Sequence, residues 1–266
     1  MPDNGHFSQT SIRAAIAAKN FTEGRLHTSC LRIMSGWYAL PADRRYPCGG
    51  GVCLADNVST PEHKVLARKI SAMSTVLLKN HGGLLPLDRT LKIVLIGADA
   101  TNGSYTAGQG SGGVQDSNAA VSPLAAMQRL GLNVKFEPAA TAVAAAKAAA
   151  AADVAILFGS AHSGEGSDRS SLLFDSSGVD SATKCRPNPC AGGLPFESVI
   201  AAVAAVQKKT VVVAAVPGQI LTDWRDSVAA ILVPFLPGEQ YGNAIADVLL
   251  GVVPPQAKLP LTFPNT

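Results

Sequence analysis

The sequence has little charge and few aromatic residues. Asp, Glu, Lys and Arg make up 15% of its 266 residues, and Phe, Trp and Tyr make up 5%. Because an average globular domain carries roughly 25% charged residues, disorder caused by high charge and low hydrophobicity is excluded. The hydrophobic fraction of 47% is enough for a sizeable core, and the length fits one large α/β domain or two small ones.

Basic clusters and long apolar runs are also missing. The net charge of +3 comes without a concentrated basic patch, so a nucleic-acid partner is not predicted. The apolar stretches, such as residues 211–217, fall well short of the roughly 20 residues that cross a bilayer, so a membrane-spanning segment is not predicted either. The first residues show no basic region followed by an apolar core and therefore no secretory signal.

Cysteine is scarce, but four of the five cysteines form two pairs of identical spacing in sequence rich in Gly and Pro: Cys48 with Cys53, and Cys185 with Cys190. Two short-loop disulfides are the favoured interpretation, which points to an oxidising compartment. A four-thiolate zinc site and free thiols stay open as alternatives, although structural zinc sites more often use shorter spacings. Cys30 falls within a helical pattern, and we expect it to be a buried thiol.

The first part of the chain has helical periodicity. Apolar residues between Ser11 and Ala39, interrupted at residues 20–23, predict two short helices, the second begun by a cap at Thr22. Residues 41–56 are rich in Gly, Pro and Cys and are predicted to be a linker. A further helix is expected from Thr60-Pro61, a cap followed by Pro, to about Met73.

Continuous apolar runs then alternate with helical stretches. Runs that are apolar on both faces suit buried strands of a parallel sheet, and the helices between them imply right-handed crossovers. The sequence therefore predicts a three-layer α/β sandwich, with a mostly parallel sheet of about five or six strands covered by helices on both faces. The predicted strands are 92–97, 132–136, 154–159, 210–216 and 228–235, and the predicted helices are 123–130, 139–152, 196–208 and 239–250.

Ligands of such sheets gather at the carboxyl ends of the strands, so the connections after Gly97, Gly159, Val216 and Phe235 are the places to search for a site. The connection after Gly97 contains glycines at 108, 110 and 113 in the G-x-G-x-x-G spacing of a dinucleotide fingerprint. Glu137 follows about two dozen residues later, close to where the fingerprint has the acidic residue that binds the ribose. The next helix begins only near Ser122-Pro123, so the glycines do not lead into a helix N-terminus. A surface loop, a loop that edges an active site and a nucleotide site are the three interpretations.

The connection after Gly159 carries the most chemistry. Glu165 stands between two glycines, so its carboxyl can be held at the sheet edge and reach another domain, although many glutamates in Gly/Ser loops are only solvated. A Ser-His-Asp hydrolase would need a G-x-S-x-G nucleophile elbow, and the sequence has none.

Several motifs, in order along the chain, resemble the C-terminal domain of glycoside hydrolase family 3, whose members include β-glucosidases, exo-β-glucanases and β-xylosidases. The connection that contains Glu165 resembles the family's acid/base loop. The segment 237–251 followed by 258–263 resembles the family's closing helix and edge strand. The other matching segments are 74–80, 82–87 and 92–97 at the start of the domain, and 108–114 with 122–124 at its glycine-rich loop.

The resemblance implies a division of the chain into residues 1–40, the remnant of a (β/α)8 barrel, residues 41–60, a linker, and residues 61–266, the C-terminal α/β sandwich. It also implies that the nucleophilic Asp lies on the barrel, just before the Met-Pro that opens this sequence. Residues 1–266 alone are therefore expected not to hydrolyse aryl β-glucosides.

The function implied is that of a retaining, β-glucosidase-like exo-hydrolase of the secretory pathway or cell exterior, acting on a β-linked glucoside or oligosaccharide without cofactor or metal. Glu165 is expected to be its general acid/base. Tyr105, His162, Asp168 and Arg169 are candidates for substrate contact, and Trp224 is a candidate for sugar stacking that is more simply a core residue. A noncatalytic α/β module and a nucleotide-binding Rossmann-like domain are the alternatives.

Overall fold

The computed structural model describes most of the chain, namely residues 7–40, 59–101, 120–139, 141–161, 163, 169, 171–174 and 196–265. The chain divides into two compact units, Met1–Val58 and Ser59–Thr266. Nothing tests the predicted assignment of residues 1–40 to a barrel remnant, and it stays a prediction. No helix in the described ranges is long and apolar enough to cross a membrane.

The first unit contains helices α1 (Gln9–Ala17) and α2 (Glu23–Ala39), which confirms the predicted helix pair. Each begins at a hydroxyl cap: the side chains of Ser8 and Thr22 accept a hydrogen bond from the backbone N–H three residues later. Cys30 lies in α2 as expected, but it is exposed, so the prediction of a buried thiol was wrong. The reason is that no residue of α2 is buried, and a helical pattern buries a thiol only where another element covers it.

The second unit is built on a six-stranded sheet with the strand order β1-β6-β5-β4-β2-β3. Strands β2 to β6 are parallel, and β1 pairs with β6 in the antiparallel direction. The strands are β1 (Val76–Asn80), β2 (Ile93–Ile96), β3 (Val134–Glu137), β4 (Val154–Ser160), β5 (Thr210–Ala215) and β6 (Ala230–Val233).

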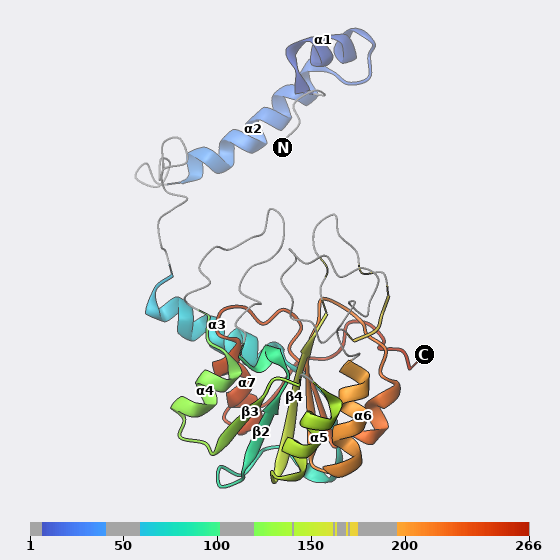
Figure 1. Ribbon diagram of the computed structural model, residues 1–266. Helices are drawn as coiled ribbons and strands as arrows, with labels where there is room; N and C mark the ends of the chain where they lie inside the picture. The colour runs from blue at the N-terminus through green and yellow to red at the C-terminus, as the bar shows by residue number, and fades with distance from the viewer. Residues whose placement is uncertain are drawn as a thin grey trace. The chain divides into compact units, whose positions relative to one another are not determined.

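Helices cover both faces of this sheet, which confirms the predicted three-layer sandwich (Figure 1). On one face α3 and α4 both contact α7, and on the other α5 contacts α6. In the described ranges, the short 3₁₀ helices η4 (His81–Gly83), η5 (Ala98–Ala100) and η10 (Asp223–Ser227) join the larger elements. The covering helices are α3 (Pro61–Ser74), α4 (Pro123–Arg129), α5 (Ala142–Ala150), α6 (Phe196–Val206) and α7 (Tyr241–Leu249).

The sheet separates two hydrophobic cores. In β4 every residue is buried, and successive side chains alternate between the faces: Ile156 and Phe158 enter the core beneath α4 and α7, whereas Leu157 enters the core beneath α5 and α6. The alanine-rich helix α5 uses Ala145 and Ala149, both fully buried, to pack closely on its core. The continuous apolar run in the sequence therefore predicted β4 correctly.

The edge strand departs from expectation. The sheet ends in β1, which the apolar-run analysis did not predict, whereas the segment 258–263, expected as an edge strand, is irregular. Pro260 supplies no N–H for a strand ladder, and Pro264 follows close behind it. The antiparallel β1 instead caps the sheet by pairing with β6.

A partly buried ion pair joins two helices of the second unit. Arg68 of α3 donates from Nε to Oδ2 of Asp247 at 2.5 Å and from Nη2 to Oδ1 at 2.6 Å. Asp247 lies on α7 and is 4% exposed. The two parallel, charge-assisted hydrogen bonds fix α3 against α7 in orientation as well as in distance.

Candidate functional site

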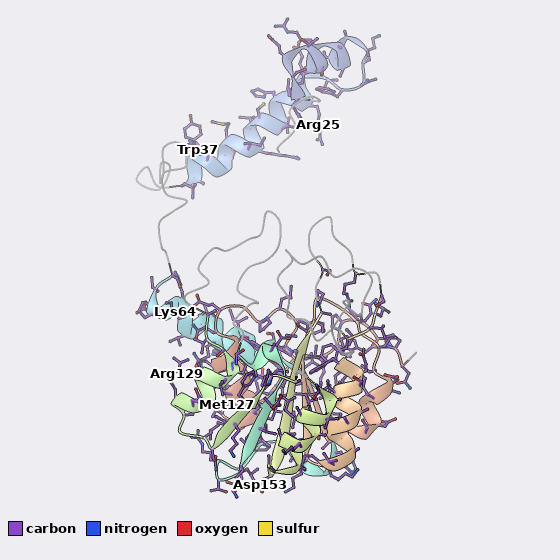
Figure 2. All side chains as sticks on the ribbon, viewed as in Figure 1. Arg25, Trp37, Lys64, Met127, Arg129 and Asp153 are labelled. Atoms are coloured by element: carbon purple, nitrogen blue, oxygen red, sulfur yellow. The ribbon has the colours of Figure 1, made fainter. Side chains whose placement is uncertain are left out.

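The carboxyl ends of β2, β4, β5 and β6 lie at one edge of the sheet, because these strands are parallel. The four connections that the sequence singled out leave from this edge, where ligands of open α/β sheets bind. The amino edge is closed differently: Asp153, which Figure 2 shows where β4 begins, accepts a hydrogen bond from the Lys92 N–H at 2.8 Å through its carboxylate.

Polar side chains are buried directly at the carboxyl edge. Ser160 ends β4, and Asp99 follows β2 on η5; both are completely buried. Tyr241, the first residue of α7, is 1% exposed, and both its burial and the nearby charge of Asp99 raise its pKa well above the ordinary value. The sequence analysis did not single out these three buried polar residues. The signal that could have found them was Asp99, a carboxyl residue directly after a continuously apolar strand.

Gly159 shows how tightly this edge is packed. A Cβ at this position would overlap the aromatic rings of Phe196 and Phe174. The two rings are perpendicular, with centroids 5.1 Å apart, so they lie directly on the end of β4. The strand can carry no side chain here, and the connection to Glu165 therefore begins from a rigid, fully buried support.

Arg169 is the predicted site residue that the structure describes. Its Nη2 donates to the backbone carbonyl of Gln219 at 2.8 Å, and Nη1 is buried with no hydrogen-bond partner among the described residues. Burial lowers the pKa of the guanidinium, since desolvation penalises the charged form. The contact joins the connection after β4 to the connection after β5.

The other predicted site residues fall outside the described ranges. These are Glu165, Asp168, His162 and Tyr105, together with the proposed disulfide partners Cys48, Cys53, Cys185 and Cys190. Trp224 is described: it is 7% exposed and stacks on Phe174, so it is a core residue. No three His, Cys, Asp or Glu side chains of the described ranges come together as metal ligands would.

Glu137 is the acidic residue of the nucleotide-site interpretation. Glu137 uses Oε1 to accept a hydrogen bond from the backbone N–H of Ala139 at 3.1 Å, closing a turn at the end of β3. Helix α4 begins at Pro123 with Ser122 as its cap, well after Gly113, as predicted. The geometry that places a pyrophosphate on a helix N-terminus is therefore not met.

A cavity of about 700 Å³ lies against β1 and β6. Among the described residues that line it, none is a predicted site residue. In its lining, Lys79 of β1 donates a hydrogen bond from Nζ to the backbone carbonyl of Arg225 at 2.9 Å. The cavity is lined by Leu78, Lys79, Thr222, Arg225, Asp226, Ile231, Leu259, Pro260, Leu261, Thr262 and Phe263.

Comparison with known proteins agrees with the resemblance. The family model "Glycosyl hydrolase family 3 C-terminal domain" matches residues 75–266. "Probable beta-glucosidase L" of Aspergillus terreus is 32% identical to the chain over 298 residues, covering 98% of the chain and 38% of that relative. The chain thus spans less than two fifths of the length of this relative.

Solved structures show the same fold. A beta-glucosidase of Chaetomella raphigera has a TM-score of 0.72 and 29% identity, over 96% of this chain and 38% of that one. A beta-D-glucoside glucohydrolase of Trichoderma reesei has a TM-score of 0.75 at 24% identity, over 100% of this chain and 39% of that one. The latter similarity concerns the fold alone.

Proposed function

The chain belongs to glycosyl hydrolase family 3, and we propose that residues 61–266 are the half of a β-glucosidase-like active site that supplies the general acid/base, Glu165. In this proposal the nucleophilic Asp and most of the sugar site lie on a (β/α)8 barrel, to which residues 1–40 belong and residues 41–60 connect. The substrate is a β-linked glucoside or oligosaccharide.

The position of β4 is the observation that carries the proposal. This strand lies inside the sheet, between β5 and β2, and all its residues are buried. The connection that follows it contains Glu165. Ser160 before the connection is fully buried, and Arg169 after Glu165 is tied to the neighbouring connection. A carboxyl carried on this connection therefore follows a fully buried strand in the interior of the sheet.

The chemistry requires two carboxyl groups with different tasks. Retaining hydrolysis places them about 5 Å apart, one attacking the anomeric carbon and the other protonating the leaving oxygen. The acid must hold its proton near neutral pH, and burial together with a neighbouring carboxylate supplies the necessary rise in pKa. Glu165 would therefore become an effective acid only when the domain packs against the barrel.

The test replaces the aligned part of the Aspergillus terreus relative with residues 1–266 and compares Glu165→Ala with the unmutated chimera. Turnover of a β-linked disaccharide should fall by about 10²–10⁴-fold, because a sugar alkoxide cannot leave unprotonated. The first step with a dinitrophenyl glucoside should be spared, and azide should accelerate the second.

Glu62→Ala, which removes an exposed carboxyl from α3, is the matched control and should leave both rates unchanged. Equal losses on the two substrates for Glu165→Ala, without rescue by azide, would assign the acid to another residue. Asp168 would then be substituted next, since it belongs to the same connection.

The proposal extends to the compartment. An enzyme exported to the cell exterior meets the oxidising conditions in which the paired cysteines would be joined. The two disulfides lie outside the described residues and stay predictions.

A further inference from the structure

In the connection after β4, Arg169 and residues 171–174 contact the body of the domain, and this stretch is called the return. Three contacts hold the return. The first is the hydrogen bond from Arg169 Nη2 to the Gln219 carbonyl, which joins residues 50 positions apart. Arg169 is half-buried, so this hydrogen bond is partly shielded from water.

The second contact is between backbones. The N–H of Leu221 donates to the carbonyl of Leu172 at 2.8 Å. Gln219 and Leu221 both belong to the connection after β5, so the two connections are joined twice within a few residues. Two ties between the same segments restrict rotation as well as separation.

Phe174 makes the third contact. Its ring is fully buried, perpendicular to Phe196 and stacked on Trp224 with centroids 5.9 Å apart. Its backbone N–H donates to Oε1 of Glu197, on α6, at 2.6 Å. The return is therefore anchored in the core beneath α6, and Arg169 is the described anchor nearest in sequence to Glu165.

We propose that Arg169 is a positioning residue, which fixes the connection carrying Glu165 by tying it to the connection after β5. In this proposal Arg169 acts through the connection that carries Glu165, and the half-buried guanidinium is bound to a backbone carbonyl. The inference rests on the proposed function for the identity of the acid. A general acid must lie within hydrogen-bond reach of the leaving oxygen, and a displacement of about 1 Å can cost about 10²-fold in rate.

Hydrogen exchange of residues 1–266 tests the tie without requiring activity. In Arg169→Ala, peptides covering 169–174 and 216–222 should exchange at least about tenfold faster, because local opening no longer breaks the Arg169–Gln219 bond. Peptides from β4 and β5 should keep their wild-type rates. Arg169→Lys should fall between the two, since one ammonium replaces a planar guanidinium.

Arg129→Ala is the matched control. Arg129 lies on α4 (Figure 2), is exposed, and donates to the carbonyl of Ala125 in its own helix at 3.2 Å. This variant, like Arg169→Ala, loses a guanidinium that is bound to a carbonyl. Because the Arg129 hydrogen bond lies within one helix, all peptides outside α4 should exchange at wild-type rates. Unchanged exchange at 169–174 in Arg169→Ala, or a uniform increase throughout the sheet, would overturn the proposal.

Kinetics in the chimera separate positioning from substrate contact. Arg169→Ala should lower kcat/KM for the disaccharide at least about tenfold more than kcat/KM for the dinitrophenyl glucoside, because kcat/KM reports the first step, in which only the poor leaving group needs the acid. Equal losses of kcat/KM on both substrates would mean that Arg169 touches the sugar and would also overturn the proposal. If Glu165→Ala shows no dependence on the leaving group while Arg169→Ala still speeds local exchange, the proposed function fails and the structural tie stands.

Discussion

Helices α2 and α7 are held in place by different forces. Helix α2 has 17 residues and none of them is buried, whereas every residue of α7 except Asn243 is buried. The Thr22 cap and intrinsic helix propensity support α2, while α7 packs against α3 and α4 and is joined to Arg68. One helix depends on its own sequence and the other on the whole domain, so the same substitution should have opposite consequences in the two.

The largest difference in stability between α7 and α2 is expected for the substitution of glycine by alanine. A Cβ at Gly242 of α7 would overlap the backbone carbonyl of Ser122, and the Gly242 N–H donates to the Val121 carbonyl at 2.8 Å, so the backbones cannot easily move apart. Gly242→Ala should cost about 3 kcal/mol of unfolding free energy, at the upper end for overpacking. At Gly36 of α2 a Cβ meets nothing within 4 Å, and Gly36→Ala should stabilise that helix by up to about 1 kcal/mol.

Denaturant unfolding can follow the two units separately, because the chain has only two tryptophans: Trp37 lies in α2 and Trp224 in the sandwich. A Trp37→Phe background reports the sandwich through Trp224 fluorescence, and helicity measured residue by residue by NMR reports α2. A loss below about 1 kcal/mol for Gly242→Ala would show that α7 tolerates displacement, and the proposed contrast between the helices would be wrong.

The pH dependence provides a second contrast. The pKa of Tyr241 is raised in the folded protein, so above about pH 10 the unfolded chain releases the phenol proton while the folded chain retains it. Its contribution to stability is thus complete below pH 10 and is lost as the pH rises further, by up to about 1.4 kcal/mol per pH unit.

In Tyr241→Phe the unfolding free energy should decrease less steeply above about pH 10 than in the wild type. Tyr38→Phe removes an exposed phenol from α2, and its unfolding free energy should decrease with pH as in the wild type. The measurement is a series of denaturant titrations across the alkaline range. Identical pH dependence in the wild type and Tyr241→Phe would contradict the prediction.

The same distinction explains how much the sequence could predict. β4 and β5 were predictable because both faces of each strand are apolar, and α2 and α3 were predictable because Thr22 and Thr60 are local caps. Local patterns of this kind need no knowledge of distant residues.

Features that depend on distant partners were missed. β1 is a strand that pairs with β6, far away in the sequence, and Cys30 is exposed on α2, which has no buried residue. The tie between Arg169 and Gln219, and the burial of Asp99, depend equally on how the connections meet at the sheet edge. The connection with Glu165 could be chosen from the order of elements, but the contacts that support it could not.

Two threonine caps give the smallest and most closely matched test. Thr22 of α2 and Thr60 of α3 each accept a hydrogen bond from the backbone N–H three residues later, and Thr60 also forms a capping box with His63. Replacing either with Ala should cost about 1 kcal/mol of helix stability. Because α3 packs on α7, Thr60→Ala should lower the unfolding free energy of the sandwich, reported by Trp224, by that amount.

Thr22→Ala should leave the Trp224 transition unchanged and instead reduce the helicity of residues 23–39, fraying α2 from its first turn. Ser29→Ala, a substitution inside the exposed helix, is the control and should not reduce helicity, since Ala is the better helix former. If Thr22→Ala moved the Trp224 transition as far as Thr60→Ala does, α2 would be coupled to the sandwich in folding. Local capping would then no longer be the main source of its stability.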